Sequence, residues 1–372
     1  MKSNPSRGPL HRRIVWAVPA LTATAVVASA LLTSTAHSSP HPTLPPRTAA
    51  QLLVEVQSSE NTNLSGTIVE TTRFGLPSLP DAGGGASLSW QSLITGTHTA
   101  QVWMAGPQKQ RVALKGTLSE SDVIHNGQDL WTYTSDSNEV SHTVLARDAA
   151  GKPPAGTIPD ARASTPTAAA RAALQAISPT TAVTVDSTQR VAGRKAYTLV
   201  LKPRDTRSTV SRITIAIDST HFVPLRVQVF GTGSTPAFET GFIGTVSFAI
   251  PKASVFNFHP PAGATVAQNP FGPQHGGGAR KEGEPGGTHP LATDSPPKVI
   301  GTGWTSIVEF PSGLPTGSAG SLIDRLTTPV GASGNKLLTT SLLNVLFMKD
   351  GRVFLGPVRP TLLEITAAAT PR

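Results

Sequence analysis

The residue types that most often carry out chemistry are sparse and scattered in this chain. Its 372 residues include no cysteine, which excludes a disulfide framework, a thiolate zinc site and a cysteine nucleophile. There is no G-x-S-x-G nucleophile elbow, no P-loop and no HExxH zinc motif. His275 precedes three glycines, as in an esterase oxyanion loop, but no nucleophile elbow accompanies it. The sequence therefore predicts a protein that is not an enzyme and has no catalytic residue, no metal site and no cofactor.

The positive charge of the chain does not indicate a nucleic-acid partner. The formal net charge is +9, and residues 1–36 contribute four of these charges and contain no acidic residue. Elsewhere the basic residues form no run and do not alternate with aromatic residues along one strand. We therefore expect no binding to nucleic acid.

Residues 1–36 have the pattern of a signal peptide or a single-pass membrane anchor. Residues 14–33 carry no charge, and a helix of that length spans about 30 Å, the thickness of a hydrocarbon core. Small residues up to Ala36 also suit a cleaved signal. Both alternatives stay open, and both place the basic end in the cytoplasm and the remainder outside it. A stiff, Pro-rich stalk is expected over 37–47.

The next residues predict a helix followed by antiparallel strands. Thr48 and Gln51 have the spacing of a capping box, which predicts a helix over 48–58. Asn126-Gly127 is the strongest two-residue hairpin signal. A second helix is expected from Thr165-Pro166 to Ile177. Alternating patterns predict strands at 65–74, 97–104, 109–116, 122–125, 129–134, 139–145, 181–191, 195–202, 209–217, 222–230 and 238–249.

The remainder of the chain divides into a linker and a structured tail. Residues 268–298 are rich in Gly, Pro and charge, which predicts a disordered linker after a domain over 48–267. Residues 299–372 are expected to form a small αβ segment that docks on the sheet. It contains a hairpin, whose first strand is the run over 337–348, and a terminal helix from Pro360.

One long antiparallel sheet with two short helices cannot cover its own inner face. We therefore predict an α+β, mostly β fold: a strongly curved antiparallel sheet (half-barrel) with the two helices on its concave side and an apolar hollow suited to acyl chains. Trp131 and Tyr133 share one face of their strand and Leu130 and Thr132 the other, so a one-residue shift would invert the lining. The candidates to line this cavity are Trp103, Val112, Leu114, Val123, Trp131, Tyr133, Leu174, Ile177, Phe222, Phe230, Phe256 and Phe258.

Several motifs, in one order along the chain, resemble the LolA-like lipoprotein-carrier family. The most specific is SDVIHNGQDLWTY at 121–133, which is similar to the family's d-G-x-x-L-W-x-Y strand pair. The others are VWMAGP at 102–107, YTLVLKP at 197–203, IAID at 215–218 with PLR at 224–226, and FNFHPPAGATV at 256–266. The resemblance covers about 48–267, and the tail 299–372 lies outside it.

The resemblance implies a non-enzymatic, extracytoplasmic carrier that binds lipid or lipoprotein acyl chains. Relatives in the family include a periplasmic partner of anti-sigma factors, so the alternative is a regulatory or sensor module that binds a membrane protein. A hydrolase is the third and least favoured hypothesis. In the family an arginine before the hairpin proline latches a helical lid, whereas this chain has Gly106 there. This departure from the family favours a cavity whose opening is governed otherwise, or a sensor role.

Overall fold

The computed structural model describes residues 42–59, 62–75, 96–116, 119–145, 165–167, 170, 180–268, 297–311, 325–331 and 334–371. These residues belong to the unit Pro42–Arg372. The expected anchor or signal over 14–33, and most of the expected helix 165–177 and linker 268–298, lie outside these ranges. Within them, no helix has the length and hydropathy that a membrane span requires.

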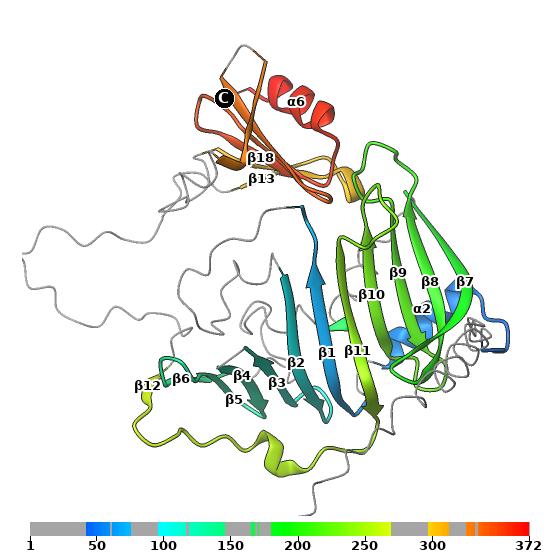
Figure 1. The fold of residues 1–372 in the computed structure, drawn as a ribbon, viewed down its shortest axis with the longest axis vertical. Coiled ribbons are helices and arrows are strands. Elements are labelled where there is room, and N and C mark those ends of the chain that lie inside the picture. The colour runs from blue at the N-terminus through cyan, green and yellow to red at the C-terminus, as the bar shows by residue number, and fades with distance from the viewer. Residues whose placement is uncertain are drawn as a thin grey trace, which may run out of the picture. The chain divides into compact units, whose positions relative to one another are not determined.

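Twelve strands form one large curved sheet in the order β12-β6-β5-β4-β3-β2-β1-β11-β10-β9-β8-β7 (Figure 1). All neighbours are antiparallel except β12, which runs parallel to β6. The prediction of a mostly β fold around a curved antiparallel sheet with few helices is therefore confirmed. The bounds are β1 Leu64–Thr72, β2 Gly96–Met104, β3 Lys109–Lys115, β4 Glu120–Asn126, β5 Asp129–Thr134, β6 Glu139–Val144, β7 Thr181–Val191, β8 Arg194–Pro203, β9 Arg212–Asp218, β10 Pro224–Phe230, β11 Phe238–Ser247 and β12 Thr265–Gln268.

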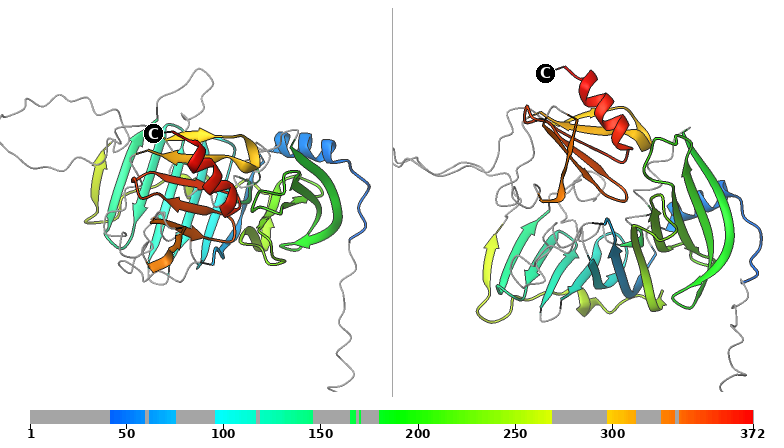
Figure 2. Two further views of the ribbon diagram at one scale, coloured as in Figure 1. Left: turned by 90° about the horizontal axis from the view of Figure 1, so that it is seen from above. Right: turned by 45° about the horizontal axis from the view of Figure 1, so that its top comes forward.

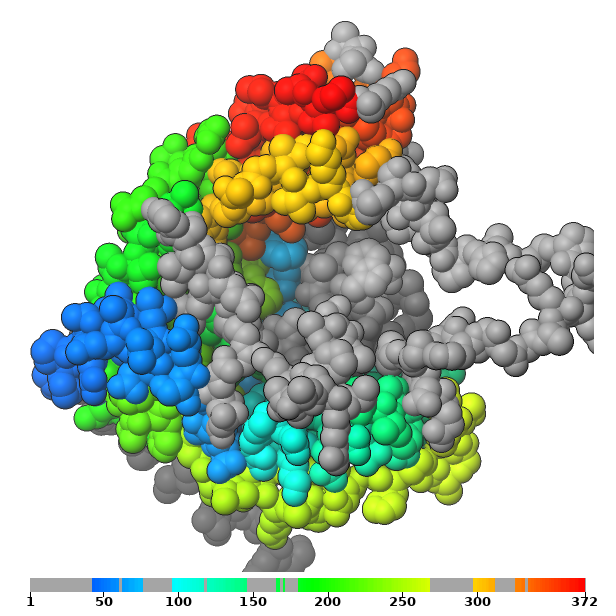
Figure 3. Space-filling model, turned by 180° about the vertical axis from the view of Figure 1, so that it is seen from behind, coloured from blue at the N-terminus to red at the C-terminus, as the bar shows by residue number. Residues whose placement is uncertain are grey.

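Helix α2 (Ala49–Ser58) begins at the predicted capping box. The backbone N–H of Gln51 donates to Thr48 Oγ1 at 3.2 Å, and the backbone N–H of Thr48 donates to Gln51 Oε1 at 2.9 Å. Leu52 and Val56 are buried and pack against one side of the sheet, which we call the inner face. Figures 2 and 3 show α2 (blue) beside the strands from β7 to β10 (green). The strand residues of this cluster are Tyr197, Leu199, Leu201, Ile213, Ile215, Ile217 and Val227.

The described end of the expected stalk, residues 42–47, lies against the sheet and has no regular secondary structure. The hydroxyl of Tyr197 donates to the carbonyl of Pro45 at 2.9 Å. Thr188 Oγ1 donates to the carbonyl of Pro42. Leu44 packs on the α2 cluster. These contacts hold residues 42–47 against the sheet.

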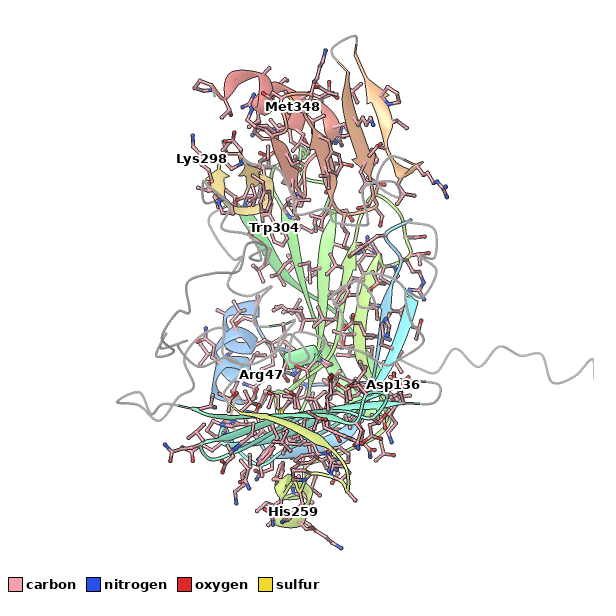
Figure 4. The ribbon with its side chains drawn as sticks, turned by 90° about the vertical axis from the view of Figure 1, so that its left-hand side faces the viewer. Arg47, Asp136, His259, Lys298, Trp304 and Met348 are labelled. Atoms are coloured by element: carbon pink, nitrogen blue, oxygen red, sulfur yellow. The ribbon has the colours of Figure 1, made fainter. Side chains whose placement is uncertain are left out.

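Residues 248–264, which we call the strap, cross the opposite or outer face of the sheet. The strap leaves β11, contains the short helix η3 (Ala253–Phe256) and ends at β12. Arg111 Nη1 on β3 donates to the carbonyl of Val255 at 3.3 Å, and Asn126 Nδ2 donates to Asn257 Oδ1 at 3.3 Å. Figure 4 shows this segment, with His259 labelled, on the side of strands β2 to β6 away from α2.

The described C-terminal residues form a small αβ segment. Six strands pair in the order β13-β14-β18-β17-β16-β15, and Leu363 and Ala367 of the terminal helix pack against this sheet. The predicted single strand over 337–348 is wrong, because a turn at Thr340 divides it: Thr340 Oγ1 accepts from the N–H of Leu343 at 2.9 Å. The bounds are β13 Lys298–Ile300, η4 Gly303–Thr305, β14 Ile307–Phe310, β15 Thr328–Val330, β16 Asn335–Thr339, β17 Asn344–Phe347, β18 Val353–Gly356 and α6 Pro360–Ala369.

Hydrogen bonds join this C-terminal segment to strand ends of the large sheet. The N–H of Thr209 donates to the carbonyl of Pro357 at 2.9 Å, and the N–H of Ser341 donates to the carbonyl of Phe74 at 3.0 Å. Trp304 Nε1 donates to Thr181 Oγ1 at 2.6 Å, and its ring is buried in the α2 cluster. The segment therefore contributes to the main core and is not an appendage without contacts.

Candidate functional site

Strand pairing gathers aliphatic side chains on the inner face of strands β1 to β5. Val112 pairs with Val102 on one side and with Val123 on the other, and residues paired in this way point to the same face. The same face continues through β1 and β11 to the strands that α2 covers. The aliphatic residues of this surface, which we call the β1–β5 inner face, are Leu64, Ile68, Ala100, Val102, Val112, Leu114, Val123 and Leu130.

These side chains are buried, but neither described α-helix packs on them. Each is at most 7% exposed. Helix α2 belongs to the cluster of β8 to β10, and α6 belongs to the C-terminal sheet. The β1–β5 inner face is therefore a broad apolar surface on which neither described α-helix packs. Such a surface suits an apolar ligand, which loses contact with water when it binds there.

A buried hydroxyl lies at the border of this surface. Thr143 on β6 pairs with Leu130, so its side chain points to the inner face. Thr143 Oγ1 is buried and has no hydrogen-bond partner among the residues that the structure describes. An unsatisfied buried hydroxyl is costly, which makes this atom available to a polar group of a ligand.

The structure divides the predicted cavity residues between the two faces. Val112, Leu114 and Val123 lie on the inner face, as the β3–β4 register requires. Trp103, Trp131 and Tyr133 point to the outer face. A single cavity cannot be lined by both groups, so only the inner-face members stay candidates to contact a ligand in the predicted hollow.

Two of the outer-face aromatic residues, Trp131 and Tyr133, pack beneath the strap. The rings of Trp131 and His142 stack with centroids 3.8 Å apart. Phe258 of the strap lies 5.5 Å from Trp131 and 5.8 Å from Tyr133 between ring centroids. Phe256, also on the strap, is 1% exposed. These predicted lining residues therefore hold the strap in place.

The remaining predicted lining residues lie elsewhere. Phe222 is in the β9–β10 turn and packs on the α2 cluster, with the Arg47 guanidinium 5.6 Å from its ring centroid. Phe230 lies on the outer face at the end of β10, and the guanidinium carbon of Arg212 is 3.7 Å from its ring centroid. Leu174 and Ile177 lie outside the described residues.

The latch position of the resembled family has a backbone that favours glycine. Gly106, in the β2–β3 turn, has a φ of +77°. An arginine at this position would be strained in that conformation. The hairpin here is therefore shaped for a residue without a side chain, consistent with a cavity that has no latch at this point.

A buried ion pair lies at the turns that end β7 and β9. The side chain of Asp218 is fully buried, and Arg194 Nε and Nη2 donate to its two oxygens at 2.6 and 3.0 Å. Burial raises the pKa of Asp218, but the hydrogen bonds from Arg194 and from the N–H groups of His221 and Thr220 outweigh it, so the pKa is lowered. The ring of His221 stacks on Phe248 at 3.7 Å between centroids, which ties the start of the strap to this pair.

The outer face also has a pocket that the sequence did not predict. It has a volume of about 390 Å³ and opens between β1, β2 and β11. Two features signal it in retrospect: Gly66 and Gly244 fall inside predicted strands, and the apolar residues of 238–249 are unevenly spaced, which is typical of a β-bulge. Within the described residues there is no group of three or more His, Asp or Glu side chains that could hold a metal ion.

No family model matches the chain, and no curated protein matches its sequence. Among solved structures, the MucA/MucB complex of Pseudomonas aeruginosa is similar at 15% identity and a TM-score of 0.45, over 86% of this chain and 96% of that chain. A LolA superfamily protein from Nitrosomonas europaea is similar at 10% identity and a TM-score of 0.23, over 57% of this chain and 99% of that chain. An uncharacterized conserved protein from Thermus thermophilus is similar at 12% identity and a TM-score of 0.34, over 59% of this chain and 98% of that chain. The structural neighbours thus include the family that the sequence motifs resemble.

Proposed function

We propose that this protein is a non-enzymatic, extracytoplasmic carrier that holds an acyl chain of a lipid or lipoprotein against the β1–β5 inner face. The observation that supports the proposal is the set of buried aliphatic side chains, in two clusters, along one face of five neighbouring strands, on which neither described α-helix packs. The polar end of the ligand would lie toward the unsatisfied hydroxyl of Thr143.

Apolar burial supplies the affinity in this proposal. Each methylene group removed from water contributes about 0.8 kcal/mol, so a chain of about ten buried methylenes offers roughly 8 kcal/mol before the cost of ordering it. An extended acyl chain needs no charged partner. The aliphatic character of Val102, Val112 and Val123 fits such a ligand.

The proposed location follows from the N-terminal sequence. Residues 14–33 either anchor the protein in the cell membrane or are removed with a signal peptide cut near Ala36. In both cases the folded unit works outside the cytoplasm, where lipids and lipoproteins move between membranes. Protease treatment of intact cells that produce the protein tests this: cleavage of the folded unit supports the location, and full protection contradicts it.

A volume-filling substitution tests the proposed binding face. Leu114→Trp places a larger ring on the β1–β5 inner face and takes the space of about two methylenes, so the affinity for a fluorescent C16 acyl probe should fall about tenfold. Ile243→Trp is the matched control, because Ile243 points to the outer face and is 48% exposed. The control should bind the probe as the unmodified protein does.

Two outcomes would overturn the carrier proposal. One is that the unmodified full chain takes up no acyl probe and yields no lipid on organic extraction. The other is that both tryptophan variants bind the probe equally well while melting at the temperature of the parent. If Leu114→Trp alone melts at a lower temperature than the parent, the smaller substitution Leu114→Phe is tested in its place. An unchanged affinity of Leu114→Phe for the acyl probe also contradicts the proposal.

The free edge of β7 favours a second candidate, a regulatory module that binds a membrane protein. Strand β7 ends the strand order, and it pairs only with β8 among the described residues. Thr184, Asp186 and Arg190 are exposed along it. An extended segment of a partner can add to such an edge through backbone hydrogen bonds. Co-purification of one stable membrane protein, unchanged by prior delipidation, would favour this candidate over the carrier.

A further inference from the structure

The pocket on the outer face is separate from the proposed acyl-binding surface. Its residues come from three neighbouring strands, and the β-sheet itself lies between this pocket and the β1–β5 inner face. The lining residues are Ser65, Gly66, Thr67, Gln101, Trp103, Ile243, Gly244, Thr245 and Ser247.

A bulge in β11 builds this pocket. Ser65 pairs with Ser247 but Thr67 pairs with Ile243, so three residues of β11 lie opposite one residue of β1. Gly244, inside the bulge, has a φ of +65°. Gly66 is the residue of β1 that lies opposite this bulge. A Cβ added to Gly66 would be 3.0 Å from the ring of Phe242, so a larger residue would crowd that ring. Bulges of this kind redirect side chains and are frequent at binding sites.

Three polar side chains of the pocket are free to bind a ligand. Within the described part of the chain, no side-chain hydrogen bond involves Thr67, Gln101 or Thr245. A threonine hydroxyl can both donate and accept, and the glutamine amide adds two donors and an acceptor. The wall therefore presents several neutral hydrogen-bonding groups at close spacing.

An aromatic ring and an exposed aliphatic chain complete the wall. Trp103 lies in the pocket, and the guanidinium carbon of Arg111 is 5.5 Å from its ring centroid. Arg111 is already engaged by Asp122, with Nη2 and Oδ2 2.9 Å apart. Ile243, which also lines the pocket, is 48% exposed. No Asp, Glu, Lys, Arg or His is among the lining residues.

This combination fits a sugar better than a lipid tail or an ion. A sugar ring has an apolar C–H face that can lie on an indole and a rim of hydroxyls that exchange hydrogen bonds with Thr and Gln side chains. A lipid tail would leave those groups unpaired, and an ionic ligand would find no opposite charge. The volume of about 390 Å³ is within the range of small-ligand sites.

We propose that this pocket binds a neutral sugar residue of a saccharide chain, with Trp103 as the stacking platform and Thr67 and Gln101 as hydrogen-bonding partners. The site is independent of acyl binding on the opposite face. It would bring the protein to a saccharide-bearing surface without using the β1–β5 inner face.

Calorimetric titration of the full chain with cellotriose, maltotriose and triacetylchitotriose tests this proposal, with trigalacturonate as the acidic control. At least one neutral trisaccharide should bind and trigalacturonate should not. Trp103→Ala should abolish the binding. Thr67→Val and Gln101→Leu, which keep the side-chain size and lie on a partly exposed surface, should each weaken it about three- to tenfold.

Trp131→Phe is the matched control, because Trp131 lies on the same outer face but packs beneath the strap. It should leave the titration unchanged. The proposal is overturned if none of the three neutral sugars binds, if trigalacturonate binds as tightly, or if Thr67→Val and Gln101→Leu titrate as the parent does. None of these results bears on uptake of the acyl probe, so this proposal and the carrier proposal fail separately.

Discussion

At the residue scale, the ion pair between Arg194 and Asp218 makes the stability of the fold depend on pH. The Asp218 side chain is fully buried and the Arg194 side chain is 30% exposed. Since the folded state holds the pKa of Asp218 below its ordinary value of 3.8, ionised Asp218 stabilises the fold above that pH. This contribution is lost as the pH falls through the lowered pKa of the folded state.

Replacing the arginine should weaken that pH dependence. Arg194→Met removes the partner and leaves a buried carboxylate, which should lower the free energy of unfolding by about 2–4 kcal/mol at pH 7. The N–H groups of His221 and Thr220 still donate to Asp218. Loss of the Arg194 hydrogen bonds nevertheless raises the pKa of Asp218 relative to the parent. Ionised Asp218 should therefore stabilise the variant less than the parent as the pH rises from 3 to 7. Urea unfolding between pH 3 and pH 7 measures both effects. Arg207→Met, in the exposed pair with Asp205, is the control and should change little; equal effects of the two variants would contradict this account.

At the element scale, the strap is held by aromatic side chains that fill the outer face of the sheet. Phe256 is 1% exposed, and Phe258 contacts Trp131 and Tyr133. These contacts join residues that are more than a hundred positions apart in the sequence. The strap therefore depends on side-chain packing more than on the short parallel pairing of β12 with β6.

Removing one of these rings should release the strap. Phe256→Ala should lower the free energy of unfolding by about 3–5 kcal/mol and make residues 249–264 sensitive to limited proteolysis. Ile250→Ala serves as the control, because Ile250 is 74% exposed on the same segment. If the two variants give the same unfolding curves and the same cleavage maps, Phe256 does not anchor the strap.

The sequence predicted the elements well and the faces poorly, for a physical reason. Caps, turns and alternating patterns are local, so Thr48-Gln51 located α2 and Asn126-Gly127 located the β4–β5 hairpin. Strand 129–134 has large side chains at Trp131 and Tyr133 and an aliphatic one at Leu130, and its pattern does not tell which side is inner. The strap decides this, because it covers the outer face with aromatic residues from a distant part of the chain. The outer pocket was missed because it depends on a register shift that no local pattern specifies.

At the scale of the whole molecule, the C-terminal segment is joined to the large sheet by close backbone contacts. Gly231, after β10, is tightly packed: an added Cβ would lie 2.3 Å from the carbonyl oxygen of Ser341. Ser341 also donates its N–H to Phe74 after β1. These contacts, with Trp304 in the main core, make the described part of 299–372 a structural part of the same unit.

Substitution of that glycine tests the docking. Gly231→Ala forces the backbone at Ser341 to move and should lower the free energy of unfolding by about 1–3 kcal/mol, with faster hydrogen exchange at Ser341 and Thr209. Gly233→Ala is the control, because its nearest neighbour would be 4.0 Å away. Unchanged exchange at both amides in Gly231→Ala would mean that the two sheets are not held together at this point.

The most direct test of the carrier proposal is to locate a bound acyl chain on the protein. The full chain would be incubated with a palmitate analogue that carries a diazirine on the chain, irradiated, digested and sequenced by mass spectrometry. The account predicts saturable cross-links at inner-face residues such as Val102, Val112, Leu114 and Val123, and none at Gln101, Ala113 or Ile243 on the outer face. Cross-links confined to the outer face, or no saturable cross-link at all, would contradict it.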